Sequence, residues 1–193
     1  MCGIAGIISL EGFDPRTLVA MTQLIRYRGP SGFGFAYSRP GYKARVEITQ
    51  QEDSTPHESR PTIGLGNRRL AILDVSAAGN QPMEIDDGAY CITFNGEIYN
   101  YTEIRETLKG RGHKFRTGTD TEVILRAYQE WQEECLNRFN GIWSFALWDR
   151  SNQRLFAHET GSASSRFTTL LLMANFTLHP RLSRFCWVHK YRA

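Results

Sequence analysis

Apolar runs and turn residues divide the N-terminal part of the chain into predicted strands and a helix. Residues 2–10 are apolar or small almost throughout, which predicts a strand covered on both faces. Asp14-Pro15 predicts the start of a helix, because an aspartate can cap it and a proline suits its first position. Strand character returns at residues 64–73. This part therefore predicts one strand before the helix and one strand after it.

A second group of elements follows. An alternating strand runs directly into Asn95-Gly96, a pair typical of hairpin turns because both residues tolerate positive φ. Residues 101–111 predict a helix, and Thr119, which has a glutamate at capping-box spacing, predicts the start of another. Residues 141–148 are apolar at both odd and even positions, so both faces of that strand should be covered. Such strands, together with the helices, predict two sheets packed on each other with helices outside.

The composition is typical of one globular domain. With 193 residues, of which 41% are apolar and 22% charged, the chain is large enough for a hydrophobic core. No stretch approaches the roughly 18 apolar residues of a membrane span, and no basic region precedes the first apolar run as in a signal peptide. The widely spaced cysteines fit neither a zinc ribbon nor a dense disulfide scaffold; they are Cys2, Cys91, Cys135 and Cys186. We therefore expect a reducing, cytoplasmic setting, with no membrane partner and no metal.

The net charge of +3 comes from the C-terminal segment. Residues 158–193 contain five basic residues against one acid, Glu159, so this segment carries +4 and residues 1–157 carry about −1. A basic protein can be a nucleic-acid binder, but the body of this chain has no basic footprint. We therefore expect no nucleic-acid partner.

Seven short motifs follow one another in residues 1–157. They are Met1-Cys2-Gly3-Ile4-Ala5-Gly6, Arg28-Gly29-Pro30, Leu65-Gly66-Asn67-Arg68-Arg69-Leu70-Ala71-Ile72-Leu73-Asp74, Gln81-Pro82-Met83, Phe94-Asn95-Gly96-Glu97-Ile98-Tyr99-Asn100, Thr117-Gly118-Thr119-Asp120-Thr121-Glu122, and Phe139-Asn140-Gly141 through Trp148-Asp149. In order and spacing they resemble the class II glutamine amidotransferase domain, the N-terminal-nucleophile (Ntn) glutaminase of asparagine synthase-like proteins. The resemblance implies an α+β fold, the four-layer αββα Ntn-hydrolase sandwich, and the hydrolysis of glutamine to glutamate and ammonia.

The resemblance identifies Cys2 as the catalytic nucleophile, provided that Met1 is removed. Cys2 then carries a thiol and a free α-amine, and an α-amine with a pKa of about 8 can take the thiol proton and return a proton to departing ammonia. By resemblance, the side-chain amide of Asn95 and the backbone N–H of Gly96 form the oxyanion hole. Taken alone, Cys2 would be an incidental small residue and Asn95-Gly96 an ordinary turn. Only the surrounding pattern favours the catalytic interpretation.

The same resemblance assigns the binding of glutamine. Arg69 would bind the α-carboxylate with its guanidinium fork, and Asp120, in the first turn of a helix, would bind the α-ammonium. Glu97 and the backbone around Leu70 and Ile72 would complete the pocket. Without the resemblance, Arg69 would be a solvated side chain and Asp120 a helix-capping acid.

Three positions depart from the family pattern. Asn67 stands where the family usually has His, Ser31 where Asp usually follows Gly-Pro, and Asn80 where His is common. Since none of these is a core catalytic position, we expect them to affect loop packing and domain contacts. Arg28 and Arg68 are expected to be structural.

The resemblance ends after residue 157. One permitted codon string for residues 158–169, read two bases later, spells Arg-Asp-Arg-Phe-Gly-Ile-Lys-Pro-Phe-Tyr-Tyr, the continuation that the family would show. With a suitable choice of codons, the same offset can also spell a second family-like segment from residue 173 onward. We therefore expect residues 158–193 to be a non-family tail translated out of frame, which the underlying DNA sequence can test. The family's closing strands would be replaced, leaving edges of the core exposed.

We interpret residues 1–157 as the glutaminase domain of an asparagine synthase-like enzyme whose synthetase domain, which uses ATP and Mg, is absent from this sequence. The glutaminase domain itself is expected to need no cofactor. Its expected partners are glutamine and a synthetase domain or subunit that uses the ammonia to make asparagine or a related amide. Two alternatives stay open: the ammonia serves a different amidotransferase acceptor, or the product is a non-catalytic fragment or binding module.

Overall fold

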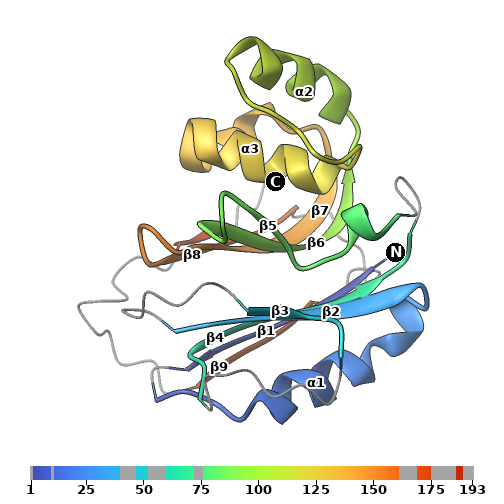
Figure 1. Cartoon of the computed structure of the whole chain (residues 1–193), viewed down its shortest axis with the longest axis vertical. Coiled ribbons are helices and arrows are strands. Elements are labelled where there is room, and N and C mark those ends of the chain that lie inside the picture. Colours follow the sequence, from blue (N-terminus) through green and yellow to red (C-terminus); the bar gives the residue numbers. More distant parts are fainter. Residues whose placement is uncertain are drawn as a thin grey trace.

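The structure is a computed structural model that describes residues 2–9, 11–39, 47–51, 60–71, 76–160, 169–174 and 186–188. Two five-stranded sheets face each other, and helices cover the outer side of each sheet (Figure 1). The layers are thus helix, sheet, sheet and helix. The predicted α+β fold with an αββα arrangement is confirmed.

The first sheet has the strand order β3-β2-β4-β1-β9. Its strands are β1 (Gly3–Ser9), β2 (Gly32–Ser38), β3 (Glu47–Thr49), β4 (Ile63–Arg69) and β9 (Thr169–Ala174). All residues of β1 are buried, as the apolar run of residues 2–10 predicts. β1 and β4 are antiparallel with Gly3 opposite Arg68, so the start of β1 lies beside the end of β4.

The second sheet has the strand order β10-β8-β7-β6-β5. Its strands are β5 (Met83–Ile85), β6 (Tyr90–Ile98), β7 (Gly141–Asp149), β8 (Arg154–Glu159) and β10 (Cys186–Val188). β6 runs through Asn95-Gly96 without turning, because these residues pair with Ser144 and Trp143 of β7. The hairpin that an Asn-Gly pair usually indicates does not form here.

Three α-helices and three short 3₁₀ segments complete the described part of the chain. They are α1 (Pro15–Leu24), α2 (Tyr101–Gly110), α3 (Asp120–Trp131), η1 (Arg26–Arg28), η2 (Ala77–Gly79) and η3 (Gln132–Arg138). Asp14 caps α1, and the Thr119 hydroxyl accepts from the Glu122 N–H at 3.2 Å, as predicted. The capping box is only half formed, since the Glu122 carboxylate accepts from the Thr117 N–H, at 2.6 Å. None of these helices is long and apolar enough to span a membrane.

Three apolar clusters fill the spaces between the four layers. One joins α1 to the first sheet around Leu18 and Phe35. A second lies between the sheets and includes Leu65 and Trp148. The third joins α2 and α3 to the second sheet and includes Tyr128. Each sheet is therefore buried on both faces, which explains the continuous apolar runs of its central strands.

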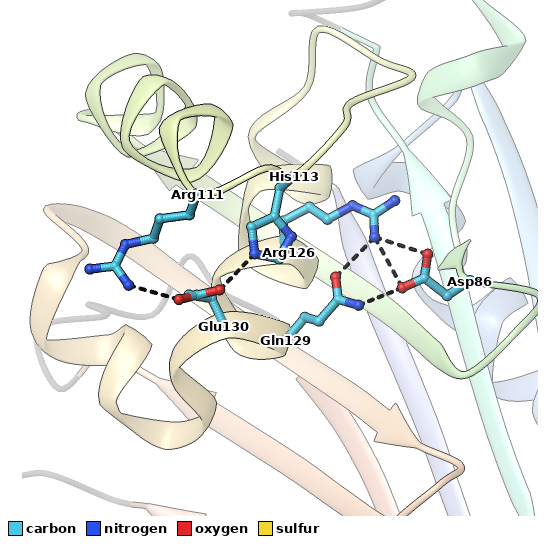
Figure 2. A network of polar contacts seen from close by, with 6 residues as sticks. All are labelled: Asp86, Arg111, His113, Arg126, Gln129 and Glu130. Carbon is cyan, nitrogen blue, oxygen red and sulfur yellow. Dashed lines mark hydrogen bonds and ion pairs between the residues drawn. The ribbon is translucent and has the colours of Figure 1, made fainter.

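Polar contacts on the outer helical layer tie α3 to its surroundings (Figure 2). Glu130 accepts from Arg111 at 2.8 Å and lies 2.8 Å from Nε2 of His113, and both of these residues follow α2. Arg126 pairs with Asp86, in the turn between β5 and β6, at 2.9 Å. These contacts orient α3, whose first residue, Asp120, lies beside the end of β6.

The tail takes part in both sheets through its backbone. β9 lies parallel to β1, and β10 lies parallel to β8. We expected replacement of the family's closing strands to leave these edges exposed. Within the described residues that expectation is wrong for residues 4–9 of β1, which pair with β9, and for residues 156–158 of β8, which pair with β10.

Candidate active site

Strand alternation brings the predicted site residues to one end of the space between the sheets. Successive side chains of a strand point to opposite faces. Along β4, Leu65 belongs to the cluster between the sheets, and Arg69 continues its row. Along β6, Asn95 continues the row of Cys91. Cys2 immediately precedes β1 and continues its inward row, so three separate strands supply side chains to one region.

The Cys2 thiol is held by the chain segment that follows β4. The Leu70 N–H donates to Cys2 Sγ at 3.3 Å, and Sγ lies 3.8 Å from the Leu70 carbonyl oxygen. On the other side, Arg28 Nε donates to the Cys2 carbonyl at 3.5 Å. Cys2 is only partly buried, so its sulfur is both oriented and reachable.

The surroundings of Cys2 keep its thiol protonated at neutral pH. Burial raises the pKa of Cys2, while the Leu70 N–H and the positive charge of Arg69 lower it and the charge of Asp120 raises it. The net shift is upward. A thiol in this state needs a base before it can act as a nucleophile, because the thiolate is the reactive form. The charge effects also show that Arg69 and Asp120 lie within electrostatic range of the sulfur.

Asn95 carries a fully buried side-chain amide. Its side chain is 0% exposed, and neither Nδ2 nor Oδ1 has a hydrogen-bond partner among the described residues. Its neighbour Gly96 has a φ of +152°, and a Cβ there would lie 2.3 Å from the Ile142 carbonyl oxygen. Only glycine fits at that point, so the strand passes unusually close to β7.

The backbone N–H groups of β6 define one edge of the site. The Phe94 N–H donates to Gln81 Oε1 at 2.6 Å, and the Ile98 N–H donates to Asp120 Oδ2 at 3.2 Å. Since alternate N–H groups of a strand point to the same side, the Gly96 N–H points to this edge as well. It lies between the Gln81 contact and the Asp120 contact.

Asp120 is a carboxylate in a buried position at the start of α3. It is 4% exposed, and burial is the main reason that its pKa is raised to about 6. The negative charge of Glu97, which is exposed, adds to this rise, and the Ile98 N–H opposes it. At neutral pH the group is therefore a carboxylate that a cationic ligand would stabilise.

Arg69 is not a solvated side chain. It is 8% exposed, and its Nη1 donates to Asn80 Oδ1 at 2.7 Å and to the Ser76 carbonyl at 2.9 Å. Its backbone carbonyl accepts from the Ser31 N–H at 3.0 Å. The guanidinium therefore has a fixed position at the end of β4.

The three departures from the family pattern contact this region. Asn80 holds Arg69, and the Ser31 hydroxyl accepts from the Ala71 N–H at 3.3 Å. Asn67 is fully buried and donates to Gln81 Oε1 at 3.2 Å. Ser31 and Asn80 thus contact residues beside the site, whereas Asn67 lies within β4 and bonds residues between the sheets, which loop packing does not describe.

Of the remaining predicted residues, the structure gives contacts for Arg68 and Leu70 only. Arg68 donates to the Thr22 carbonyl at 3.2 Å and stacks on Phe33, so it joins the first sheet to α1. Leu70 touches the sulfur directly. Ile72 lies outside the described residues. No cluster of three or more His, Cys, Asp or Glu side chains that could hold a metal occurs in the described ranges.

Sequence reasoning gave no role to Gln81. It is 7% exposed and contacts both sheets and α3. The Gln-Pro-Met motif marks its position, but the residue type alone does not reveal which segments it joins.

Comparisons with known proteins identify the family to which the chain belongs. Residues 1–159 match the family model described as "Glutamine amidotransferase domain". Over 161 residues the chain is 34% identical to a glutamine-hydrolyzing asparagine synthetase of Bacillus subtilis, covering 81% of this chain and 22% of that protein. Over 171 residues it is 32% identical to one of Arabidopsis thaliana, covering 86% of this chain and 25% of that protein. The chain thus spans about a quarter of the length of these curated relatives.

The solved structures that are similar support the fold. One is the glutamine phosphoribosylpyrophosphate amidotransferase of Bacillus subtilis, with a TM-score of 0.58 at 18% identity over 77% of this chain and 35% of that chain. A second, described as the allosteric regulatory enzyme of purine biosynthesis, gives a TM-score of 0.53 at 20% identity over 76% of this chain and 34% of that chain.

Proposed function

Because the chain belongs to the glutamine amidotransferase domain family, we propose that it hydrolyses glutamine to glutamate and ammonia through a thioester on Cys2. The observation that carries this proposal is the buried Asn95 amide, which has no hydrogen-bond partner among the residues that the structure describes. Leaving a buried polar group unpaired costs about 1–3 kcal/mol, so such a group calls for an explanation. A substrate oxygen that develops negative charge is the partner that would use its donor.

The proposed reaction begins with a proton transfer. Once Met1 is removed, the free α-amine of Cys2 takes the thiol proton, and the thiolate attacks the side-chain amide carbon of glutamine. The carbon–sulfur bond forms, and the carbonyl oxygen becomes an oxyanion that accepts from Asn95 Nδ2 and the Gly96 N–H. The intermediate then expels ammonia, which takes its proton from the α-ammonium. Water hydrolyses the resulting thioester and releases glutamate.

The charged side chains at the same end of the sheets suit the two ends of free glutamine. Arg69, fixed by Asn80, would bind the α-carboxylate. Asp120 would bind the α-ammonium, with Glu97 adding negative charge nearby. Leu70 and Ile72 would line the remainder of the pocket. No step in this scheme requires a cofactor.

The fate of the ammonia is a further part of the proposal. The relatives are named asparagine synthetases, and the chain covers only about a quarter of their length. We therefore propose that the ammonia passes to a synthetase domain or subunit that forms asparagine or a related amide. We also keep residues 1–157 as the glutaminase unit and residues 158–193 as an added tail, which the family match over residues 1–159 supports.

The proposed function is tested by measuring both products and the mass of the purified chain. We expect equimolar glutamate and ammonia from glutamine, together with a mass that shows loss of Met1. Without that loss, the nitrogen of Cys2 is a peptide nitrogen with no basicity. An inactive chain that retains Met1 would favour the non-catalytic alternative, whereas an inactive chain that begins at Cys2 would contradict the proposal.

The affinity for glutamine should fall at acidic pH. The pKa of Asp120 is about 6 in the folded chain, so below that pH the group is protonated and cannot pair with the ammonium. In the Cys2→Ala variant, which has no reactive thiol, we expect the Kd for glutamine to rise up to about tenfold per pH unit below 6. Isothermal titration calorimetry at several pH values between about 4.5 and about 7.5 measures how the Kd for glutamine changes as Asp120 titrates.

Glutaramate, which is glutamine without its α-amino group, is the matched control ligand. Its affinity should be weaker at neutral pH and should not fall in the same way as the pH decreases. If glutamine and glutaramate show the same pH dependence, Asp120 does not bind the ammonium.

A further inference from the structure

We propose that Gln81 is a positioning residue that holds Asn95 and Gly96 in register with Arg69 and Asp120. The proposal rests on the proposed function, since it concerns the same site. It assigns to a side chain that would not touch glutamine the task of fixing the groups that would. Its basis is the set of three hydrogen bonds that the Gln81 amide makes.

In the first contact, the Gln81 side chain takes the place of a backbone hydrogen bond that β5, which begins at Met83, does not reach. β5 begins at Met83, which lies opposite Ile92, so the continued register would place Gln81 opposite Phe94. At that point the side-chain carbonyl of Gln81 accepts from the Phe94 N–H at 2.6 Å. The side chain thus does what a backbone carbonyl does elsewhere in a sheet. It anchors β6 at the residue immediately before Asn95.

The second contact reaches the opposite sheet. Gln81 Oε1 also accepts from Asn67 Nδ2 at 3.2 Å, and Asn67 lies two residues before Arg69 on β4. Asn67 itself donates to the Thr93 hydroxyl at 3.2 Å. The segment that ends in Arg69 and the segment that carries Asn95 therefore share one buried amide.

The third contact reaches the outer helical layer. Gln81 Nε2 lies 3.3 Å from the Thr121 hydroxyl and donates to it, and Thr121 directly follows Asp120 in α3. One amide group thus joins the three segments that carry the proposed oxyanion donors, the proposed carboxylate binder and the proposed ammonium binder.

The backbone of Gln81 is fixed independently of these contacts. A Cβ on Gly34 would lie 2.3 Å from the Gln81 carbonyl oxygen, so the loop lies directly against β2. The side chain is also buried, with 7% exposed. A buried amide on a backbone held in this way can set the relative positions of its three hydrogen-bond partners, because none of them can move without losing its bond.

Positioning matters most for Asn95 because its own side chain makes no internal hydrogen bond among the described residues. The direction of its amide therefore depends on the backbone of β6. A displacement of about 1 Å in a catalytic group can cost about a hundredfold in rate. Gln81 is the contact that fixes this backbone on the side where β5 has not yet begun.

A double-mutant cycle with Asn95 tests the proposal. Gln81→Leu removes both polar atoms at similar volume and should lower kcat for glutamine at least about tenfold. In an Asn95→Ala background the same substitution should lower kcat by a clearly smaller factor than in the wild-type background, because one of the two oxyanion donors that it positions is gone. Gln81→Glu should recover much of the loss, since the Phe94 N–H, the Asn67 amide and the Thr121 hydroxyl can all donate to a carboxylate.

A measurement that needs no activity accompanies the cycle. Gln81→Leu should speed amide hydrogen exchange at Phe94 by at least about tenfold, because that N–H loses its acceptor. Ser38→Ala is the matched control: it removes another buried hydrogen bond between the sheets, from Trp148 Nε1 at 3.1 Å, at the opposite end of β2. It should change neither Phe94 exchange nor kcat beyond about twofold.

The outcomes separate the two proposals. Equal losses of kcat in the wild-type and Asn95→Ala backgrounds, or unchanged exchange at Phe94, would overturn the role of Gln81 while leaving glutamine hydrolysis intact. Absence of hydrolysis in the wild-type chain that begins at Cys2 would overturn the proposed function, and with it the catalytic purpose of Gln81.

Discussion

Cys2→Ala should abolish glutamine hydrolysis, with a loss of at least about a thousandfold in kcat, because removing a catalytic nucleophile leaves only binding and the oxyanion donors. The structure provides the reason for so large an effect. Among the cysteines whose side chains the structure describes, no other thiol is suitable: Cys91 and Cys135 are fully buried, and burial raises the pKa of Cys135 to about 12. Ammonia release measured with glutamine at saturation gives the result.

Cys135→Ala is the matched control for this experiment. It removes a thiol of the same kind from the outer helical layer, so kcat per folded molecule should stay within about twofold of wild type. Glutamine binding should persist in Cys2→Ala, since Arg69 and Asp120 are unchanged. A Cys2→Ala chain that hydrolyses glutamine within tenfold of wild type would contradict the thioester mechanism.

Asn95→Ala should lose activity without losing stability. Removing one oxyanion donor costs about 10²–10³-fold in kcat, with little change in KM. We expect the stability to be kept because the Asn95 amide has no hydrogen-bond partner in the described ranges, so its removal breaks no internal hydrogen bond. The free energy of unfolding should therefore stay within about 1 kcal/mol of wild type. Steady-state kinetics and urea unfolding measure the two quantities on the same sample.

Asn67→Ala is the contrasting variant. Asn67 is an equally buried amide on the facing strand, but its Nδ2 donates to Gln81 and to Thr93. Its replacement breaks both of these buried hydrogen bonds, so we expect a loss of about 1–3 kcal/mol in the free energy of unfolding. If Asn95→Ala destabilises the chain as much as Asn67→Ala, then Asn95 has a structural role and its assignment as an oxyanion donor is weakened.

Much of the fold follows from local sequence signals. The buried run before Leu10, the cap at Asp14 and the start of α3 at Thr119 all form as predicted. Asn95-Gly96 is the informative failure of local reasoning. Its turn propensity is overridden because both residues pair with β7, over a close approach that only glycine allows.

The site is less accessible to sequence reasoning than the fold. Asn95 and Asp120 can be nominated from motifs, but the absence of a partner for one and the raised pKa of the other depend on packing. The role of Gln81 could not be predicted, because its contacts join segments that are 13 to 40 residues apart in the chain. The tail does not match the family, so we expected it to leave edges of the two sheets unpaired. Within the described residues that expectation was wrong, because backbone pairing at an edge needs little sequence specificity.

The early start of β1 has a practical consequence for how the protein can be prepared. Gly3 already lies in a buried strand, and Cys2 is held by Leu70, so the proposed nucleophile lies directly beside the first sheet. An affinity tag or fusion partner placed ahead of Cys2 would occupy the site and convert the amine into an amide. If the proposed mechanism holds, any such extension has to be cleaved so that Cys2 becomes the first residue, and uncleaved recombinant protein is expected to be inactive.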